Sequence, residues 1–161
     1  MIAISQPTYL PWIGYFGLIM NSDIFIFLDD VQFDKRSWQQ RNYIRNKDNK
    51  VLLTVPVQTK GKFKQTIKSV KIDNSVNWHN KHLNTILHCY SKTKYFEDHY
   101  LDLKNILIKK TETISSLNIK IIKMICNKLK IKTKFINSSV FNLDFKKDEL
   151  LYNLCKKVDA N

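Results

Sequence analysis

Two short segments near the start of the chain carry the residue types best suited to chemistry. The first, residues 6–16, places two prolines, several aromatic side chains and Gly14 just before a run typical of a helix. The prolines restrict the backbone, the glycine permits a close approach, and the first turn of a helix offers free N–H groups to an anion. We therefore predict phosphate binding at this helix start, with Tyr9 stacking on a base or sugar. The alternative is that the aromatic residues only pack beneath a sheet.

The second segment, residues 29–42, places a pair of carboxylates before a group of cations. Asp29 and Asp30 can bind Mg²⁺, act as a general base or accept hydrogen bonds from sugar hydroxyls. Two adjacent aspartates point to opposite sides of an extended chain, so we do not predict a metal site. We expect one of these carboxylates to position or deprotonate an acceptor. The alternative is that they form structural ion pairs with the neighbouring cations.

The cations of this part of the chain are mainly arginines. All three arginines lie within ten residues, at Arg36, Arg41 and Arg45. A guanidinium group binds phosphate in a bidentate manner, and a compositional bias toward lysine does not explain such clustering. We therefore predict that the arginines, together with Lys35, bind the phosphates of a ligand. Trp38 offers a second face for stacking on its base or sugar.

The overall charge points to an anionic partner. The 161 residues contain 27 Lys and Arg against 14 Asp and Glu, which gives a formal net charge of +13 and an isoelectric point of about 9.6. Most of the lysines are spread along the chain and are expected to form a solvated coat. A nucleic-acid-binding domain is the alternative function, although the sequence contains no helix-turn-helix, RNP or zinc-finger signature. We therefore expect a small anionic substrate and no specific nucleic acid.

The elements around the two segments predict an α/β fold. Residues 2–5 and 24–28 are short apolar runs typical of buried strands, and residues 12–20 have the pattern of a helix between them. Such a βαβ unit contains parallel strands, and ligands bind outside the carboxyl ends of parallel strands. Both segments begin at such an end. We predict a mixed, largely parallel, Rossmann-like sheet whose carboxyl ends form the site.

The second half of the chain is predicted to be rich in helices. The expected further strands are residues 51–57, 67–72 and 133–136, and the expected further helices are residues 76–90, 101–109, 114–129 and 147–158. Ser115 or Ser116 is expected to cap the helix that begins there. Because the pattern contains no linker or repeat, we expect one domain over residues 1–161.

The cysteines and the hydropathy pattern suggest where the protein works. Cys89, Cys126 and Cys155 are an odd number of widely spaced residues with apolar neighbours, which predicts buried thiols rather than disulfides or metal ligands. No apolar run approaches the roughly 18 residues that a membrane span needs, and the first residues do not form a cleavable leader. We therefore expect a cytoplasmic protein.

Together, the two segments resemble a bacterial family, the WbqC-like proteins. The similarity rests on the opening motif Gln-Pro-Thr-Tyr-Leu-Pro-Trp-Ile-Gly-Tyr-Phe, on Asp-Asp-Val-Gln leading to Lys35, Trp38 and Arg41-Asn42, and on Trp78 with His82. It extends from residue 1 to about residue 158. This family is associated with gene clusters for O-antigen and other surface polysaccharides. The resemblance therefore implies a transferase that binds a phosphate-bearing or nucleotide-linked sugar.

The resemblance also implies which residues form the site. Asp29, Asp30 and His82 would be the catalytic residues. The recurrent residues expected to bind substrate are Gln6, Pro7, Gly14, Tyr15, Gln32, Lys35, Trp38, Arg41, Asn42 and Trp78, joined by Tyr9 and Arg36 for the stacking and charge reasons given above. The motifs specify no cofactor.

Two differences from related patterns bear on these expectations. The turn before the first helix resembles the phosphate-binding start of nucleotidylyltransferases, whose His-x-Gly-His signature is replaced here by Trp12-Ile13-Gly14-Tyr15. Without those imidazoles, cytidylyl or adenylyl transfer is not expected. WbqC-like proteins usually continue past the last helix into a strand and an Asn-Pro-x-Gly-Gly segment, whereas this chain stops at Asn161. We expect a shortened C-terminal end, and a non-catalytic remnant is a further alternative.

Overall fold

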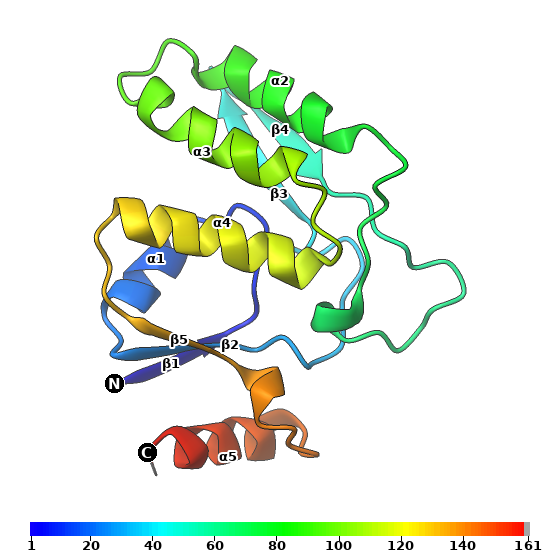
Figure 1. The fold of residues 1–161 in the computed structure, drawn as a ribbon, viewed down its shortest axis with the longest axis vertical. Coiled ribbons are helices and arrows are strands. Elements are labelled where there is room, and N and C mark those ends of the chain that lie inside the picture. Colours follow the sequence, from blue (N-terminus) through cyan, green and yellow to red (C-terminus); the bar gives the residue numbers. More distant parts are fainter. Residues whose placement is uncertain (160–161) are drawn as a thin grey trace.

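The computed structural model, which describes residues 1–159, contains a parallel three-stranded sheet (Figure 1). The strand order is β1-β2-β5, with β1 at Ile2–Ser5, β2 at Ile24–Phe27 and β5 at Lys134–Asn137. Helix α1 (Ile13–Met20) connects β1 to β2, and the strands pair in parallel from Ile2 opposite Ile24 onward. The predicted βαβ start and α/β fold are confirmed.

The side chains of the sheet alternate between two faces, as the period of a strand requires. One face packs against α1 and α4 (Ile114–Lys128), and the other packs against α5 (Lys147–Asp159). Figure 1 shows the sheet between these two helical layers. The residues on the α1 and α4 face are Ala3, Phe25, Phe27 and Phe135, and those on the α5 face are Ile2, Ile4, Ile24, Ile26 and Ile136.

A second core lies beside the parallel sheet, against an antiparallel hairpin. The hairpin consists of β3 (Arg41–Asn46) and β4 (Asn49–Thr54), and it forms a separate two-stranded sheet. Helices α2 (Trp78–Tyr90) and α3 (Phe96–Ile108) lie next to it in Figure 1. Buried side chains of the hairpin, of both helices and of α4 form this core, which makes α4 a shared wall between the two cores.

Strand β3 is absent from the expected elements, and the expected strand at residues 67–72 is wrong. Residues Ile67–Ser69 form a short 3-10 turn, and the residues after it make only isolated bridges, such as Val57 with Ile72. The buried positions are Ile67, Val70 and Ile72, a spacing that follows the turn rather than a strand. The alternating exposure of β3 is obscured in the sequence because both its faces carry polar side chains.

The start of α4 differs from the expected capping. The cap is Thr113, whose Oγ1 accepts a hydrogen bond from the backbone N–H of Ser116 at 3.3 Å, rather than Ser115 or Ser116. Helix α3 begins at Phe96, earlier than expected, because the acidic side chains of Glu97 and Asp98 suit the first turn of a helix.

The cysteines are free thiols in the part of the chain that the structure describes. Cys126 is buried, and burial raises the pKa of its thiol to about 11. Cys89 and Cys155 are half-buried, so the expectation of three buried thiols is wrong for these two. Over residues 1–159, no helix combines the length and the apolar character needed to cross a membrane. Ala160 and Asn161, where a shortened C-terminal end was expected, lie outside the described residues.

Candidate functional site

The two predicted segments meet at a cavity beyond the carboxyl end of β1. It encloses about 410 Å³, and we call it the tryptophan cavity. Its lining residues are Ser5, Thr8, Pro11, Trp12, Tyr15, Trp38 and Asn42. Trp12 from the first segment is 71 % exposed, and Trp38 from the second is 55 % exposed. Two indole rings are therefore available to a ligand in one cavity, with hydroxyl and amide groups between them.

Hydrogen bonds fasten the loop after β1 to the segment before β3. The backbone N–H of Tyr9 donates to the carbonyl of Trp38 at 2.9 Å. The Asn42 side chain donates to the carbonyls of Tyr9 at 3.3 Å and Leu10 at 2.7 Å. The Gln6 side chain accepts from Gln39 Nε2 at 2.9 Å. Gln6 and Asn42, two residues predicted to bind substrate, therefore hold the shape of the cavity.

Asn118 of α4 forms hydrogen bonds to both segments. This residue was not identified from the sequence. Asn118 is completely buried, and its Nδ2 donates to the carbonyls of Pro7 at 3.0 Å and Gln39 at 2.8 Å. Tyr15 also closes the loop, because its hydroxyl donates to the carbonyl of Gln6 at 3.0 Å. Burial raises the pKa of the Tyr15 hydroxyl, so it remains a hydrogen-bond donor at physiological pH.

The position of the Trp12 ring depends on the absence of a side chain at Gly14. A Cβ atom at position 14 would overlap the indole ring of Trp12, which lies across the first turn of α1. We expect Gly14→Ala to displace this exposed ring and change its fluorescence, with little loss of stability because the ring can swing into solvent. Gly17→Ala is the matched control in the same helix, since nothing lies within 4 Å of its added Cβ. Equal fluorescence spectra for the two variants would contradict this prediction.

Tyr9, Trp78 and His82 form a buried aromatic group behind the loop. The Tyr9 hydroxyl lies 2.9 Å from Nδ1 of His82, and the Trp78 ring packs edge-on to the imidazole with centroids 5.2 Å apart. Tyr9 is completely buried and His82 is 4 % exposed. Of the two rings proposed for stacking, Trp38 is therefore the accessible one. His82 lines neither the tryptophan cavity nor the lysine cavity defined below, within the described residues.

The environment of His82 favours a neutral imidazole. Burial lowers its pKa to about 4, an effect only partly offset by a hydrogen bond to the backbone of Thr54. With one ring nitrogen donating to Thr54, Nδ1 accepts from the Tyr9 hydroxyl. Burial also raises the pKa of Tyr9, so that the hydroxyl stays protonated. The pair thus positions the loop that carries Tyr9.

The two adjacent aspartates follow the end of β2 and border different cavities, although both carboxylates lie near the Ser138 hydroxyl. Asp29 has the same parity as Phe25 and Phe27 and lies on the α4 side, where it is 2 % exposed. Its carboxylate accepts from Asn137 Nδ2 at 2.9 Å, and from the backbone N–H and hydroxyl of Ser139 at 3.1 and 3.2 Å. The carboxylate of Asp29 therefore ties β2 to the end of β5.

Asp30 is the more accessible of the two carboxylates. It is half-buried, accepts a hydrogen bond from the Ser138 hydroxyl, and borders a cavity of about 650 Å³ with Gln32 and the segment before α5. Gln32 is exposed and pairs with Thr66 in an isolated bridge. These two predicted residues lie on the α5 side of the sheet rather than at the tryptophan cavity.

The structure does not bring the predicted cations to the tryptophan cavity. Among the described residues, neither Lys35 nor any of the three arginines lines it. Lys35 contacts the ring of Phe63 and the carbonyl of Thr59. Arg41 opens β3, and Arg45 lies four residues along the same strand, about 13 Å away at the usual rise per residue. Arg36 is exposed in the preceding turn, with a φ of 60°.

Two further cavities border α4. The first, which we call the lysine cavity, encloses about 350 Å³ beyond β2 and β5. Lys68, Lys120 and Lys123 line it, together with Asp29 and Ser115. Apart from Asp29, these residues were missed in the sequence. The spacing of Ser115, Ser116, Lys120 and Lys123 along one helix face is a signal that could have revealed them.

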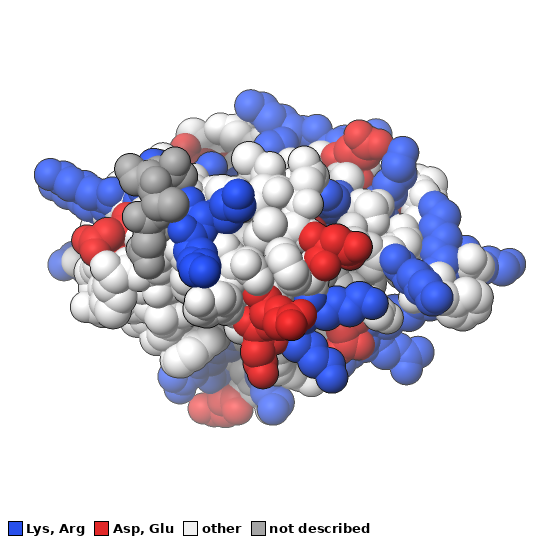
Figure 2. All heavy atoms as spheres, turned by 90° about the horizontal axis from the view of Figure 1, so that it is seen from below, with Lys and Arg blue, Asp and Glu red and all other residues white. Residues whose placement is uncertain are grey.

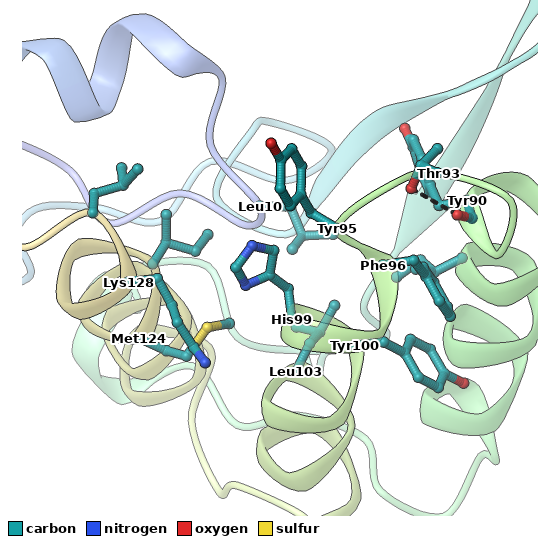
Figure 3. Close-up of a pocket in the computed structure, with 13 residues that line it drawn as sticks. Leu10, Tyr90, Thr93, Tyr95, Phe96, His99, Tyr100, Leu103, Met124 and Lys128 are labelled. Atoms are coloured by element: carbon teal, nitrogen blue, oxygen red, sulfur yellow. Dashed lines mark hydrogen bonds between the residues drawn. The ribbon is translucent and has the colours of Figure 1, made fainter.

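The other cavity is mainly apolar and lies between α2, α3 and α4 (Figure 3). It encloses about 480 Å³, and Tyr95, His99 and Leu103 are among its lining residues. Leu10, next to the buried Tyr9, reaches it from the loop after β1. None of the predicted site residues lines it within the described part of the chain, so we do not include it in the candidate site. Residues 1–159 contain no group of three or more side chains arranged to bind a metal ion.

Comparisons with known proteins agree with the motifs. A sequence model of the WbqC-like protein family matches residues 6–161. The uncharacterized protein Rv1507c of Mycobacterium tuberculosis is 38 % identical over 160 residues, which cover 99 % of this chain and 69 % of that protein. No solved structure was found to match.

Proposed function

The chain belongs to the WbqC-like protein family, and we propose that it binds a nucleotide-linked sugar for a transfer reaction in the assembly of bacterial surface polysaccharide, such as O-antigen. As part of the same proposal, the protein works in the cytoplasm. The tryptophan cavity would hold the base or the sugar, and the phosphates would lie toward the carboxyl ends of the neighbouring strands.

The observation that carries this proposal is the pair of exposed indoles at one cavity. Exposed tryptophans are uncommon on a protein surface, and here Trp12 and Trp38 come from segments 26 positions apart that hydrogen bonds hold together. An indole provides a flat apolar face for a base or a sugar ring. The hydroxyls of Ser5 and Thr8 would add polar contacts to sugar hydroxyls.

Within this proposal, the three candidate catalytic residues have different roles. Asp29 and His82 are buried and their polar atoms already have protein partners, so we propose that they position the site. Asp30 is half-buried and borders the cavity next to α5. We propose that the acceptor approaches the strand ends from this side and that Asp30 accepts its proton.

On the face that includes the end of α5 (Figure 2), the surface charge does not favour nucleic acid as the ligand. Figure 2 shows the face that includes the end of α5, where blue lysines and arginines are separated by white surface and by red carboxylates. Nucleic-acid-binding domains instead gather their cations along one stripe or patch. A small anionic substrate suits this arrangement better, because it needs only a few cations at one cavity.

Calorimetric titration with nucleotide-linked sugars tests the proposal. We expect the wild-type protein to bind a UDP- or dTDP-linked amino sugar, and we expect Trp12→Ala and Trp38→Ala each to weaken binding about tenfold, as loss of one stacking face predicts. Tyr152→Ala is the matched control, because Tyr152 is an exposed aromatic residue on α5 and lies outside this cavity.

Two results would contradict the proposal. The first is the absence of binding heat with every nucleotide-linked sugar. The second is affinity in both tryptophan variants equal to that of Tyr152→Ala.

A further inference from the structure

We propose that the lysine cavity binds a phosphate or diphosphate group. Lys120 and Lys123 lie one turn apart on α4, and Lys68 reaches the cavity from the 3-10 turn on its other side. Within residues 1–159, none of these lysines forms an ion pair. Lys120 Nζ donates to the hydroxyl of Thr111 at 3.3 Å, and Lys123 Nζ lies 5.7 Å from the ring centroid of Phe135. Three lysine side chains therefore line the cavity, and none of them is paired with a carboxylate among the described residues.

The start of α4 adds hydrogen-bond donors to the same cavity. Two N–H groups of its first turn are already used, since Ile114 donates to the carbonyl of Val70 and Ser116 donates to Thr113 Oγ1. Ser115 lies between them and is only 4 % exposed. Neither its backbone N–H nor its hydroxyl has a hydrogen-bond partner among the described residues.

Because Ser115 lines the cavity and its hydroxyl has no protein partner, this hydroxyl is free to bind a ligand or water there. Ser115 lines the lysine cavity, so its free donors border the same space as the three lysine side chains. The N-terminal end of a helix also carries a partial positive charge. Helix end, hydroxyl and lysines together form the arrangement that binds phosphate oxygens in many proteins.

The one carboxylate at this cavity, that of Asp29, already has hydrogen-bond partners in the protein. Asp29 accepts hydrogen bonds from Asn137 and Ser139, and its carbonyl accepts from the backbone N–H of Lys68 at 2.8 Å. These bonds hold the β5 end and the turn of Lys68 around the cavity. The three lysines outnumber this single negative charge, and the net charge of the lining favours an anion.

This inference deepens the proposed function and rests on it for the class of ligand, because it identifies where the phosphates of a nucleotide-linked sugar would bind. Both cavities lie on the α4 side of the sheet at the carboxyl ends of its strands. The residues involved differ completely, since the lysine cavity contains neither tryptophan among its described lining residues. The two proposals can therefore be tested separately.

Calorimetric titration with inorganic pyrophosphate, without divalent cations, tests the lysine cavity. We expect the wild-type protein to bind this probe and Lys68→Ala and Lys123→Ala each to weaken binding about tenfold, through loss of a charge-assisted contact. Lys104→Ala removes the same charge from an exposed position on α3 outside the cavity, and we expect less than a twofold change. No binding by the wild type, or an equal loss in Lys104→Ala, would overturn the inference.

Ser116→Asp provides a second, independent readout, because Ser116 also lines the cavity in the first turn of α4 and is only half-buried. A carboxylate in the first turn suits the positive end of α4, so we expect an unchanged or raised melting temperature. The same carboxylate would occupy the cavity and repel pyrophosphate, so we expect binding to be lost in a folded protein. Normal pyrophosphate binding by this variant would overturn the inference.

The two proposals fail in different ways. Nucleotide-sugar binding that needs Trp38 but not Lys68 would overturn the lysine cavity and leave the proposed function intact. Pyrophosphate binding that needs Lys68, without any nucleotide-sugar binding, would support the lysine cavity and overturn the proposed function.

Discussion

Asp29→Ala is expected to lower the free energy of unfolding by about 3 kcal/mol, because it removes a buried carboxylate that is the acceptor for three donors of half-buried residues. The donors are Asn137 Nδ2 and the N–H and hydroxyl of Ser139, all within 3.2 Å of the carboxylate. A bond that a charged acceptor makes in a buried site contributes more than an exposed one. Urea unfolding monitored by circular dichroism measures the difference.

Asp30→Ala is the matched control for this prediction. Asp30 is the next residue and carries the same charge, but it is half-buried and accepts only from the Ser138 hydroxyl among the described residues. We expect it to lose about 1 kcal/mol. Asp29→Asn should fall between the two, since its amide retains one acceptor oxygen. Equal losses for Asp29→Ala and Asp30→Ala would show that Asp29 does not hold β5.

The contrast between these variants bears on mechanism. If Asp29→Ala unfolds the site while Asp30→Ala leaves the fold intact, a loss of transfer activity in Asp30→Ala reports chemistry directly. The adjacent carboxylates would then have different roles, since Asp29 positions the strand ends and Asp30 faces the acceptor. The physical reason is burial, because Asp29 is 2 % exposed whereas Asp30 is half-buried and borders a separate cavity.

The protein is expected to lose about 3 kcal/mol of stability between pH 7.5 and pH 4 through His82 alone. The imidazole has an ordinary pKa of 6.5, and burial lowers this pKa to about 4 in the folded protein. Below pH 6.5 the unfolded chain therefore binds a proton that the folded chain does not, and stability falls as the pH falls. The loss approaches its full size near pH 4, where the folded imidazole begins to protonate.

Urea unfolding at a series of pH values checks this effect. His82→Gln removes the titrating group, so its stability should depend less on pH, by about 3 kcal/mol over this range. His88→Gln is the matched control, because His88 is exposed on the same helix. Parallel stability curves for the wild type and His82→Gln would contradict the assignment of His82 as a buried neutral residue.

Local pattern was sufficient to predict the elements that bury one continuous apolar face. The unit of β1, α1 and β2 was predicted within one or two residues, and so was α4, because each has a strong apolar pattern. The prediction failed at β3, where polar side chains on both faces hide the alternation. It also failed at residues 67–72, which lie next to α4 in the fold and follow its surface rather than a strand partner.

The site residues were also predicted well where local pattern was sufficient and poorly where packing decided their position. Trp38 and Asn42 were identified from one segment and Tyr15 from the other, and the structure places all three at one cavity. The arginines were predicted to cluster from their proximity in the sequence, yet a strand separates Arg41 from Arg45. Proximity along an extended chain does not bring side chains together, since each residue advances the strand by over 3 Å.

The sequence by itself determined the family, the α/β class and the two segments that carry the unusual residues, because these depend on residue type and local spacing. The tertiary structure alone decided which residues are accessible. Tyr9 and His82 are buried against each other, whereas Trp12 and Trp38 are exposed at a shared cavity. It also decided that Asn118 joins both segments, through bonds to carbonyls 111 and 79 positions away. Burial and long-range hydrogen bonds depend on how elements pack, and a local pattern does not specify packing.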